Sequence, residues 1–293
     1  MNINKIVWLL IVLTIFSFAL GGLILKSNTQ IHEINEEKTL GMENITRLQI
    51  ETPSENVNII KSDSEEMRAV LHGTVESYNM GNFGKLLADQ TGQTIKIEIK
   101  RPLRFFSFDE RENLYLDIYV PKTYENTLGL NGVSGDVKIK DMKLKSFDFM
   151  TVSGDLSGDN ISAELKLNSV SGDLNLEKSR GKISANTVSG KINIEYANFE
   201  NLTADSVSGD ITLKLPKESC FDLNLDTVSG ELNTDFSLKV TGSFKNPKEQ
   251  FTGFYCYEGN TTTAGKINVE TVSGNIDLRQ IPIGEPEKSG GIT

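Results

Sequence analysis

The tripeptide Val-Ser-Gly occurs seven times in this 293-residue chain, and its spacing constrains the fold more than any other feature. Successive glycines lie 19, 18, 18, 19, 21 and 44 residues apart. A motif that returns at a nearly fixed period is typical of repeat architectures, in which each unit stacks on the next. The repeated residues are Ser134, Gly135, Ser153, Gly154, Ser171, Gly172, Ser189, Gly190, Ser208, Gly209, Ser229, Gly230, Ser273 and Gly274.

Apolar residues alternate with polar ones on both sides of each motif, which indicates short strands with one buried face. Val137 and Ile139 follow the first glycine, and Leu128 and Leu130 lie nine residues before them. Two short strands per coil of 18–21 residues cannot bury their inner face alone, so the coils would stack about 4.8 Å apart. The sequence therefore predicts an all-β fold, a parallel β-helix-like β-solenoid. The alternative, an antiparallel meander, would show Asn-Gly or Asp-Gly turns at similar spacing.

The same alternation, continued through the motif, predicts which of its side chains face inward. In the third copy Ser169 and Ser171 would lie inside and Val170 outside. The glycine would take a backbone conformation that a Cβ hinders. The opposite phase, with valine inside and serine outside, stays open. The motif is structural in either case.

The position after each glycine would form one further column along the stack. In chain order it holds Asp136, Asp155, Asp173, Lys191, Asp210, Glu231 and Asn275. Like charges about 4.8 Å apart would repel by about 1 kcal/mol per pair in water, and Lys191 would relieve this repulsion. The acids either accept hydrogen bonds from the amides of their own turns or attract divalent cations that bridge to anionic wall polymer.

Residues 6–25 form an uncharged run that is long enough to cross a bilayer core of about 30 Å as a helix. We expect a single-pass membrane anchor over 1–26, with the C-terminal domain outside the cytoplasm. A cleaved signal peptide is the alternative, because Ser17-Phe18-Ala19 offers small residues to a peptidase. However, the apolar run continues through Leu25 and is too long for an ordinary signal peptide.

The rest of the chain divides by pattern. Residues 27–44 are expected to form a polar juxtamembrane linker, and 45–126 a strand-rich lead-in that caps the solenoid. The repeat solenoid would span 127–280 with an insertion at about 235–262, followed by a disordered tail over 281–293. The insertion carries aromatic residues that are expected to fold over the last coils as a flap, namely Phe244, Phe251, Phe254, Tyr255 and Tyr257.

Two cysteines, Cys220 and Cys256, would lie outside the cytoplasm, where a disulfide is permitted. Two regular coils would separate them by about 9.6 Å, more than the roughly 7 Å between Cα atoms that a disulfide tolerates. The insertion between them breaks this regularity. Their pairing is therefore left open and is not favoured.

Several kinds of function are disfavoured. The net charge of −10 argues against nucleic-acid binding, which needs a basic surface. His32 falls in the linker and His72 in a strand pattern, and no base is placed to activate a serine. Cysteine and histidine lack the paired spacing of a metal site. We therefore expect no catalytic residues, no cofactor and no metal.

The run "LYLDIYVPKTYENTLGLNGVSGDVKI", followed by repeated "TVSGD", resembles the bacterial putative-adhesin family of β-strand repeat proteins, in particular its membrane-anchored LiaG-like members. The similarity covers about residues 44–280. It implies an envelope-associated, non-catalytic β-solenoid, and it supplies no ligand-binding residues.

Three functions are compatible with this pattern. The first is a cell-envelope scaffold, adhesin-like or interaction protein that contacts envelope proteins or wall polymer. The second is an accessory or sensor component of an envelope stress-response system. The third, a carbohydrate-active enzyme, would need clustered carboxylates and exposed aromatic residues on one face, and the sequence has no such cluster.

Overall fold

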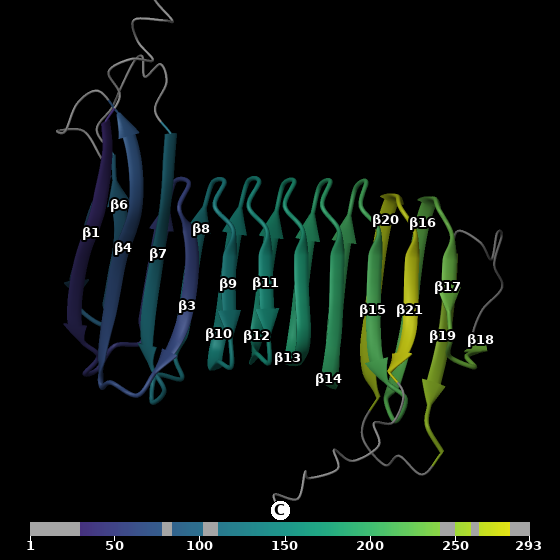
Figure 1. The fold of residues 1–293 in the computed structure, drawn as a ribbon. Coiled ribbons are helices and arrows are strands. Elements are labelled where there is room, and N and C mark those ends of the chain that lie inside the picture. Colours follow the sequence, from purple (N-terminus) through teal and green to yellow (C-terminus); the bar gives the residue numbers. More distant parts are fainter. Residues whose placement is uncertain (1–29, 78–83, 102–110, 241–249, 259–263, 282–293) are drawn as a thin grey trace, which may run out of the picture.

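The chain folds into a row of β-coils. The computed structural model describes residues 30–77, 84–101, 111–240, 250–258 and 264–281, and these residues form 21 strands. Figure 1 shows the strands side by side, with the purple N-terminal strands at one end of the row and yellow-green strands at the other. Most coils give one strand to each of two sheets, and β13 and β14 turn from one sheet into the other. The predicted all-β, solenoid-like fold is confirmed.

The first sheet contains the strand that precedes each Val-Ser-Gly corner. In spatial order its strands are β5 (Lys85–Thr91), β6 (Thr94–Lys100), β2 (Arg47–Thr52), β8 (Thr127–Gly132), β10 (Lys143–Thr151), β12 (Ser162–Ser169), the second halves of β13 (Leu174–Thr187) and β14 (Ile192–Ser206), β20 (Gly265–Ser273), β16 (Cys220–Ser229), β19 (Gln250–Cys256) and β18 (Lys239–Val240).

The second sheet contains the strand that follows each corner. In spatial order its strands are β1 (Gln30–Gly41), β4 (Glu66–Ser77), β7 (Arg111–Pro121), β3 (Asn56–Ser62), β9 (Val137–Lys140), β11 (Leu156–Asp159), the first halves of β13 and β14, β15 (Ile211–Pro216), β21 (Ile276–Ile281) and β17 (Leu232–Thr234). Neighbours from β3 to β17 are parallel, whereas β1, β4 and β7 pair antiparallel.

The core consists of inward columns in which equivalent residues of successive coils are directly paired. One column of the first sheet contains Leu48, Leu128, Phe147, Leu165, Ile183, Leu202, Ile267 and Leu223. Every member of this column is at most 3% exposed, so the alternation found in the sequence identifies the buried face correctly. Burial of each such side chain contributes about 1.5–3 kcal/mol, which makes this columnar core the main stabilising element.

The coils do not stack in chain order at the C-terminal end. The last coil, β20 with β21, lies between the β14–β15 coil and the β16–β17 coil. Figure 1 shows β21, in yellow, between β15 and β17. In the column after the glycines, Asn275 therefore stands between Asp210 and Glu231, whereas chain order would place it last.

Two expectations at the N-terminal side have different outcomes. Residues 30–41, expected as part of a linker, form β1, which pairs antiparallel with β4 along its whole length. The pairing supplies these residues with a partner for their backbone groups, which a polar composition alone does not reveal. The predicted anchor over 6–25 lies outside the described residues, as does the tail from 282 onward. Within the described residues, no helix is long and apolar enough to span a membrane.

Candidate binding surface

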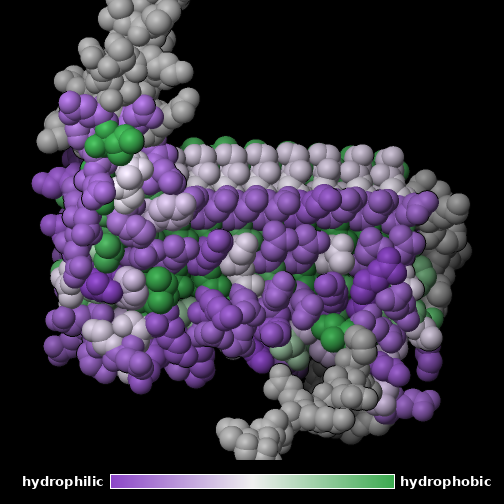
Figure 2. All heavy atoms as spheres, viewed as in Figure 1, coloured by the Kyte–Doolittle hydropathy of each residue, from purple (hydrophilic) through white to green (hydrophobic). Residues whose placement is uncertain are grey.

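All seven Val-Ser-Gly corners lie along one edge of the stack. The valines of the motif are 46–69% exposed and form an outer row. The serines are exposed beside them and the glycines are mostly buried. Figure 2 shows straight rows along this edge, a pale one and a hydrophilic one below it. The sequence repeat thus brings all the predicted repeat residues together on one surface.

The phase predicted for the corner is right for valine and wrong for serine. In the corner from Thr187 to Gly190, Thr187 is 5% exposed, Val188 is 46% exposed and Ser189 is exposed. The strand alternation ends at the threonine because the backbone turns there, so two consecutive side chains point outward. Ser189 Oγ donates a hydrogen bond to the carbonyl of Val170 in the preceding coil. The serine hydroxyl therefore links coils from outside the core.

The glycines are required by close contact between coils, and the expectation of a special backbone conformation is wrong. The described glycines with positive φ are Gly73, Gly92 and Gly181, none of which belongs to the motif. A Cβ on Gly190 would approach the carbonyl group of Gly172 more closely than 3.0 Å. Equivalent contacts occur at each of the seven corners. Successive corners can therefore stack only if this position has no side chain.

The column after the glycines forms a hydrogen-bond ladder between coils. Asp136 Oδ1 accepts a bond from the amide of Asp155 at 3.0 Å, and Asp155 Oδ1 accepts one from the amide of Asp173 at 2.7 Å. The acids thus bond the next coil, and not the amides of their own turn. Lys191 interrupts the ladder, because its side chain has no acceptor for the amide of Asp210. Each ladder acid also keeps a second carboxylate oxygen, which adds negative charge to the edge.

An eighth corner, missed in the sequence, begins the stack. The residues from Thr52 to Asn56 connect β2 to β3 as the motif connects the later strands, and Asn56 Oδ1 accepts a bond from the amide of Asp136. Glu55 replaces the glycine and is 1% exposed. Its carboxylate pairs with Arg101 and accepts a bond from Thr52 Oγ1. The Thr-x-Ser pattern was the available signal, but glutamate in place of glycine concealed it.

A groove of about 530 Å³ opens on the outer face of the second sheet, over β3, β9, β11 and β13. The β3–β9 pairing ends at Ile59 and Ile139, whereas β3 follows β7 as far as Ser62. Strand β3 therefore departs from β9 beyond this point, and a second hollow of about 460 Å³ adjoins the groove there. Sequence analysis could not find this groove, because it depends on where strand pairing stops.

Polar groups of opposite charge line the groove. Lys140 Nζ lies 3.0 Å from Asp159 Oδ2, and the hydrogen bond to Asp159 raises the pKa of Lys140, so its ammonium stays charged. Asp159 Oδ1 is buried and has no hydrogen-bond partner among the described residues. Asn175 Oδ1 accepts a bond from Asn193 at 2.7 Å, which orients the Asn175 amide. The site therefore offers both hydrogen-bond donors and acceptors.

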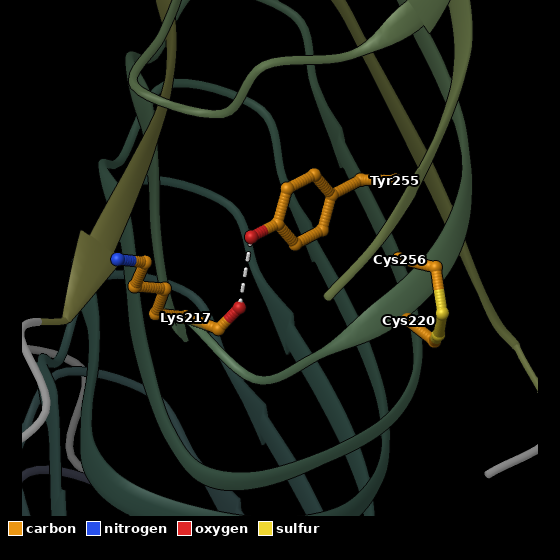
Figure 3. The surroundings of a disulfide bond; sticks show 4 residues. All are labelled: Lys217, Cys220, Tyr255 and Cys256. Atoms are coloured by element: carbon orange, nitrogen blue, oxygen red, sulfur yellow. Dashed lines mark hydrogen bonds between the residues drawn. A yellow bond between two sulfur atoms is a disulfide. The ribbon is translucent and has the colours of Figure 1, made fainter. Parts of the chain in front are cut away.

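The C-terminal end of the stack is closed by the insertion. Strand β19 pairs antiparallel with β16 and brings Cys220 opposite Cys256, with 4.0 Å between their Cα atoms and a disulfide between them. The expectation that disfavoured this pair is wrong, because Cys256 lies on an added strand and not two coils away. Figure 3 shows the disulfide and the Tyr255 hydroxyl, which donates to the carbonyl of Lys217 at 3.0 Å.

Aromatic side chains pack beneath this closing strand. The rings of Phe221 and Tyr255 lie 5.5 Å apart, and the ring of Phe236 lies 4.7 Å from that of Tyr255. Tyr255 and Phe236 are at most 9% exposed. Tyr255 therefore covers the end of the stack, and Phe251 and Tyr257 are partly buried against the core, as expected of the insertion, whereas Phe254 is not among the residues packed on the core. Phe244 lies outside the described residues.

His72, which the sequence placed in a strand pattern, lies in β4 and pairs with a carboxylate of β7. His72 Nε2 lies 3.0 Å from Asp117 Oδ2 and its ring stacks on Tyr115, with 5.7 Å between ring centroids. Asp117 also accepts a bond from Asn58. Among the described residues, no group of three or more His, Cys, Asp or Glu side chains could hold a metal ion.

Comparison with known proteins gives one family. A family model described as Toastrack DUF4097 matches residues 45–279. This range includes the eighth corner, all seven repeated corners and the groove. Among curated proteins, none matches the sequence of this chain.

Solved structures with low sequence identity are also similar. A "putative cell adhesion protein" from Clostridium sporogenes is 14% identical, with a TM-score of 0.39, over 85% of this chain and 100% of that one. A "putative adhesin" from Bacteroides fragilis is 11% identical, with a TM-score of 0.42, over 85% and 97%. A "Putative lipid binding protein" from Parabacteroides distasonis is 14% identical, with a TM-score of 0.41, over 84% and 96%. At these TM-scores the chains superpose only loosely.

Proposed function

Because this chain belongs to the Toastrack DUF4097 family, with residues 45–279 matching its model, we propose that it is a non-catalytic, adhesin-like scaffold of the bacterial cell envelope. The residues before 26 anchor it in the membrane, as in LiaG-like proteins, and the solenoid lies outside the cytoplasm. There the solenoid presents its outer faces to envelope proteins or wall polymer.

The observation that carries this proposal is that the polar groups at the corners hold neighbouring coils together. Serine hydroxyls donate to the neighbouring coil, and the ladder carboxylates accept from it. Groups that could otherwise perform chemistry are therefore engaged in holding coils in register. A stack of this kind supplies long, fixed surfaces for contact, as solenoid proteins commonly do.

The location is supported by two independent features. The uncharged run over 6–25 has the length of a membrane-spanning helix. The disulfide between Cys220 and Cys256 is of a kind that persists in oxidising compartments outside the cytoplasm. The first feature supports a membrane location, and the second supports the outer side of the membrane.

Thiol labelling in intact cells tests this topology. Val188 is 46% exposed, so Val188→Cys should react with a membrane-impermeant maleimide in intact bacterial spheroplasts. Leu213→Cys is the matched control, since Leu213 is fully buried and should stay unlabelled until the protein is denatured. Labelling of Val188→Cys only after lysis would contradict the proposed orientation.

A further inference from the structure

We propose that the groove over β3, β9, β11 and β13 binds an uncharged oligosaccharide. This inference deepens the proposed function by naming the chemistry of one envelope partner. It rests on the proposed position of the solenoid outside the cytoplasm, where such chains are encountered.

The charges of the groove favour a neutral ligand. Its charged lining consists of Lys138 and Lys140 together with Asp159 and Glu177, which sum to zero. A ligand with a net charge would meet attraction and repulsion within the same groove. A hydroxyl group, in contrast, both donates and accepts hydrogen bonds, so it can satisfy an ammonium and a carboxylate alike.

Hydrogen-bonding capacity in the groove is also unused. Asp159 Oδ1 lacks a donor among the described residues, although its partner oxygen is bonded to Lys140. The Asn175 amide is held through its Oδ1, which leaves its Nδ2 hydrogens for other acceptors. A ligand hydroxyl that enters the groove can supply the missing donor when the Asp159 side chain turns toward it. A buried polar group without a partner is costly, so this bond would favour binding.

One apolar side chain lies beside these polar groups. Ile60 belongs to the groove lining and is half-buried on its outer face, whereas the side chains of Ile59 and Ile139 are only 2% exposed and belong to the core. Ile60 is paired in register with Tyr119 of β7, whose ring carries the Arg68 guanidinium 4.1 Å above its centroid. Small-molecule sites commonly combine an apolar surface with a few fixed polar groups. The C–H faces of sugar rings fit such a surface, and their hydroxyls fit its polar border.

An extended peptide is the competing occupant, and the strand geometry disfavours it. A peptide that adds a strand needs a free sheet edge along several residues. Here β3 pairs with β7 on one side, and only Ile60–Ser62 extend beyond its last pair with β9. Three residues give too short an edge for stable strand addition.

Binding is tested with the full chain purified in detergent micelles, using cellotetraose and tetra-N-acetylchitotetraose as uncharged probes and ligand-observed NMR to follow titration. Wild type should bind at least one probe saturably. Ser157→Phe fills the groove from an exposed strand position and should raise the dissociation constant at least tenfold. Thr212→Phe is the matched control, because Thr212 lies in the same outward column but outside the groove. Its dissociation constant should stay within twofold of the wild-type value.

A second variant guards against local misfolding. Asn175→Ala removes a donor without adding bulk and should weaken binding about threefold to tenfold, with an unchanged circular dichroism spectrum. Absence of saturable binding to both probes, or equal binding by Ser157→Phe and wild type, would overturn the proposal. So would tighter binding of a polyol phosphate or of an extended peptide. The two tests fail independently. Absence of oligosaccharide binding would not change the labelling of Val188→Cys, and a different membrane orientation would not change oligosaccharide binding by the purified chain.

Discussion

Substitution of a corner glycine should be strongly destabilising, for a reason that the structure gives. In Gly190→Ala the new Cβ would lie 2.7 Å from the carbonyl carbon of Gly172 and 3.0 Å from Thr187 Oγ1. Both neighbours are held by the stack, so the two coils must separate at this corner. Overpacking of this kind costs about 1–3 kcal/mol.

Separation also weakens the bonds that join the two corners. Ser189 N donates to the carbonyl of Val170 at 2.9 Å, and Lys191 N donates to Asp173 Oδ1 at 2.7 Å. Loss of two hydrogen bonds adds about 2 kcal/mol. Gly190→Ala should therefore lower the free energy of unfolding by about 3–5 kcal/mol. Urea denaturation followed by circular dichroism measures this change.

Two other glycines separate the effect of contact from that of backbone conformation. Gly92 has a φ of 58° and no atom within 4 Å of an added Cβ, so Gly92→Ala should cost about 1–2 kcal/mol through its left-handed conformation alone. Gly41 has neither constraint, so Gly41→Ala should be close to neutral. The reasoning is refuted if Gly190→Ala falls within 0.5 kcal/mol of Gly41→Ala (about the size of ordinary surface effects), or if Gly92→Ala is the more damaging change.

Four further substitutions test individual contacts by the same urea assay. Val188→Thr should change the free energy of unfolding by less than about 0.5 kcal/mol because the side chain is exposed. Thr187→Val should lower it by about 1–3 kcal/mol, because the buried amide of Gly190 loses its acceptor. Equal effects of the two changes would contradict the assigned phase, in which threonine faces inward and valine outward. Lys191→Asn should raise the free energy of unfolding by about 1 kcal/mol in high salt, because the side-chain oxygen of the new asparagine can accept a hydrogen bond from the amide of Asp210 and complete the ladder. A loss of stability would show that the ladder is not continuous there. Ser179→Ala should stabilise by about 1 kcal/mol, because the Ser179 hydroxyl is fully buried with no partner among the described residues, and a destabilised variant would point to a bonded hydroxyl.

The repeat allowed the buried strand faces to be predicted, because buried and exposed residues alternate along the regular parts of the strands. It failed for Ser189 because the corner is not a strand, and period-two alternation has no meaning where the backbone turns. Gly190 was correctly singled out, but a sequence cannot distinguish a glycine needed for φ from one needed for contact. That distinction depends on the carbonyl of the adjacent coil.

Long-range order was the part that sequence reasoning could not reach. The chain makes an excursion between Glu231 and Asn275. As a result, the last coil, β20 with β21, lies between the β14–β15 coil and the β16–β17 coil. The same excursion brings Cys256 beside Cys220 on an antiparallel strand. The groove likewise arises where β3 leaves β9, and no local pattern marks that point.

Cysteine cross-linking across the C-terminal coils tests the central claim, an in-register stack with its last coil interleaved. Thr203 is paired with Asn268, and Asn268 with Asn224. Adjacent coils are about 4.8 Å apart and alternate ones about 9.6 Å, beyond the roughly 7 Å limit for a disulfide. Oxidation should therefore cross-link Thr203→Cys with Asn268→Cys within one molecule, and not Thr203→Cys with Asn224→Cys. Cross-linking of the 203–224 pair without the 203–268 pair would mean that the coils follow chain order, and would contradict the account.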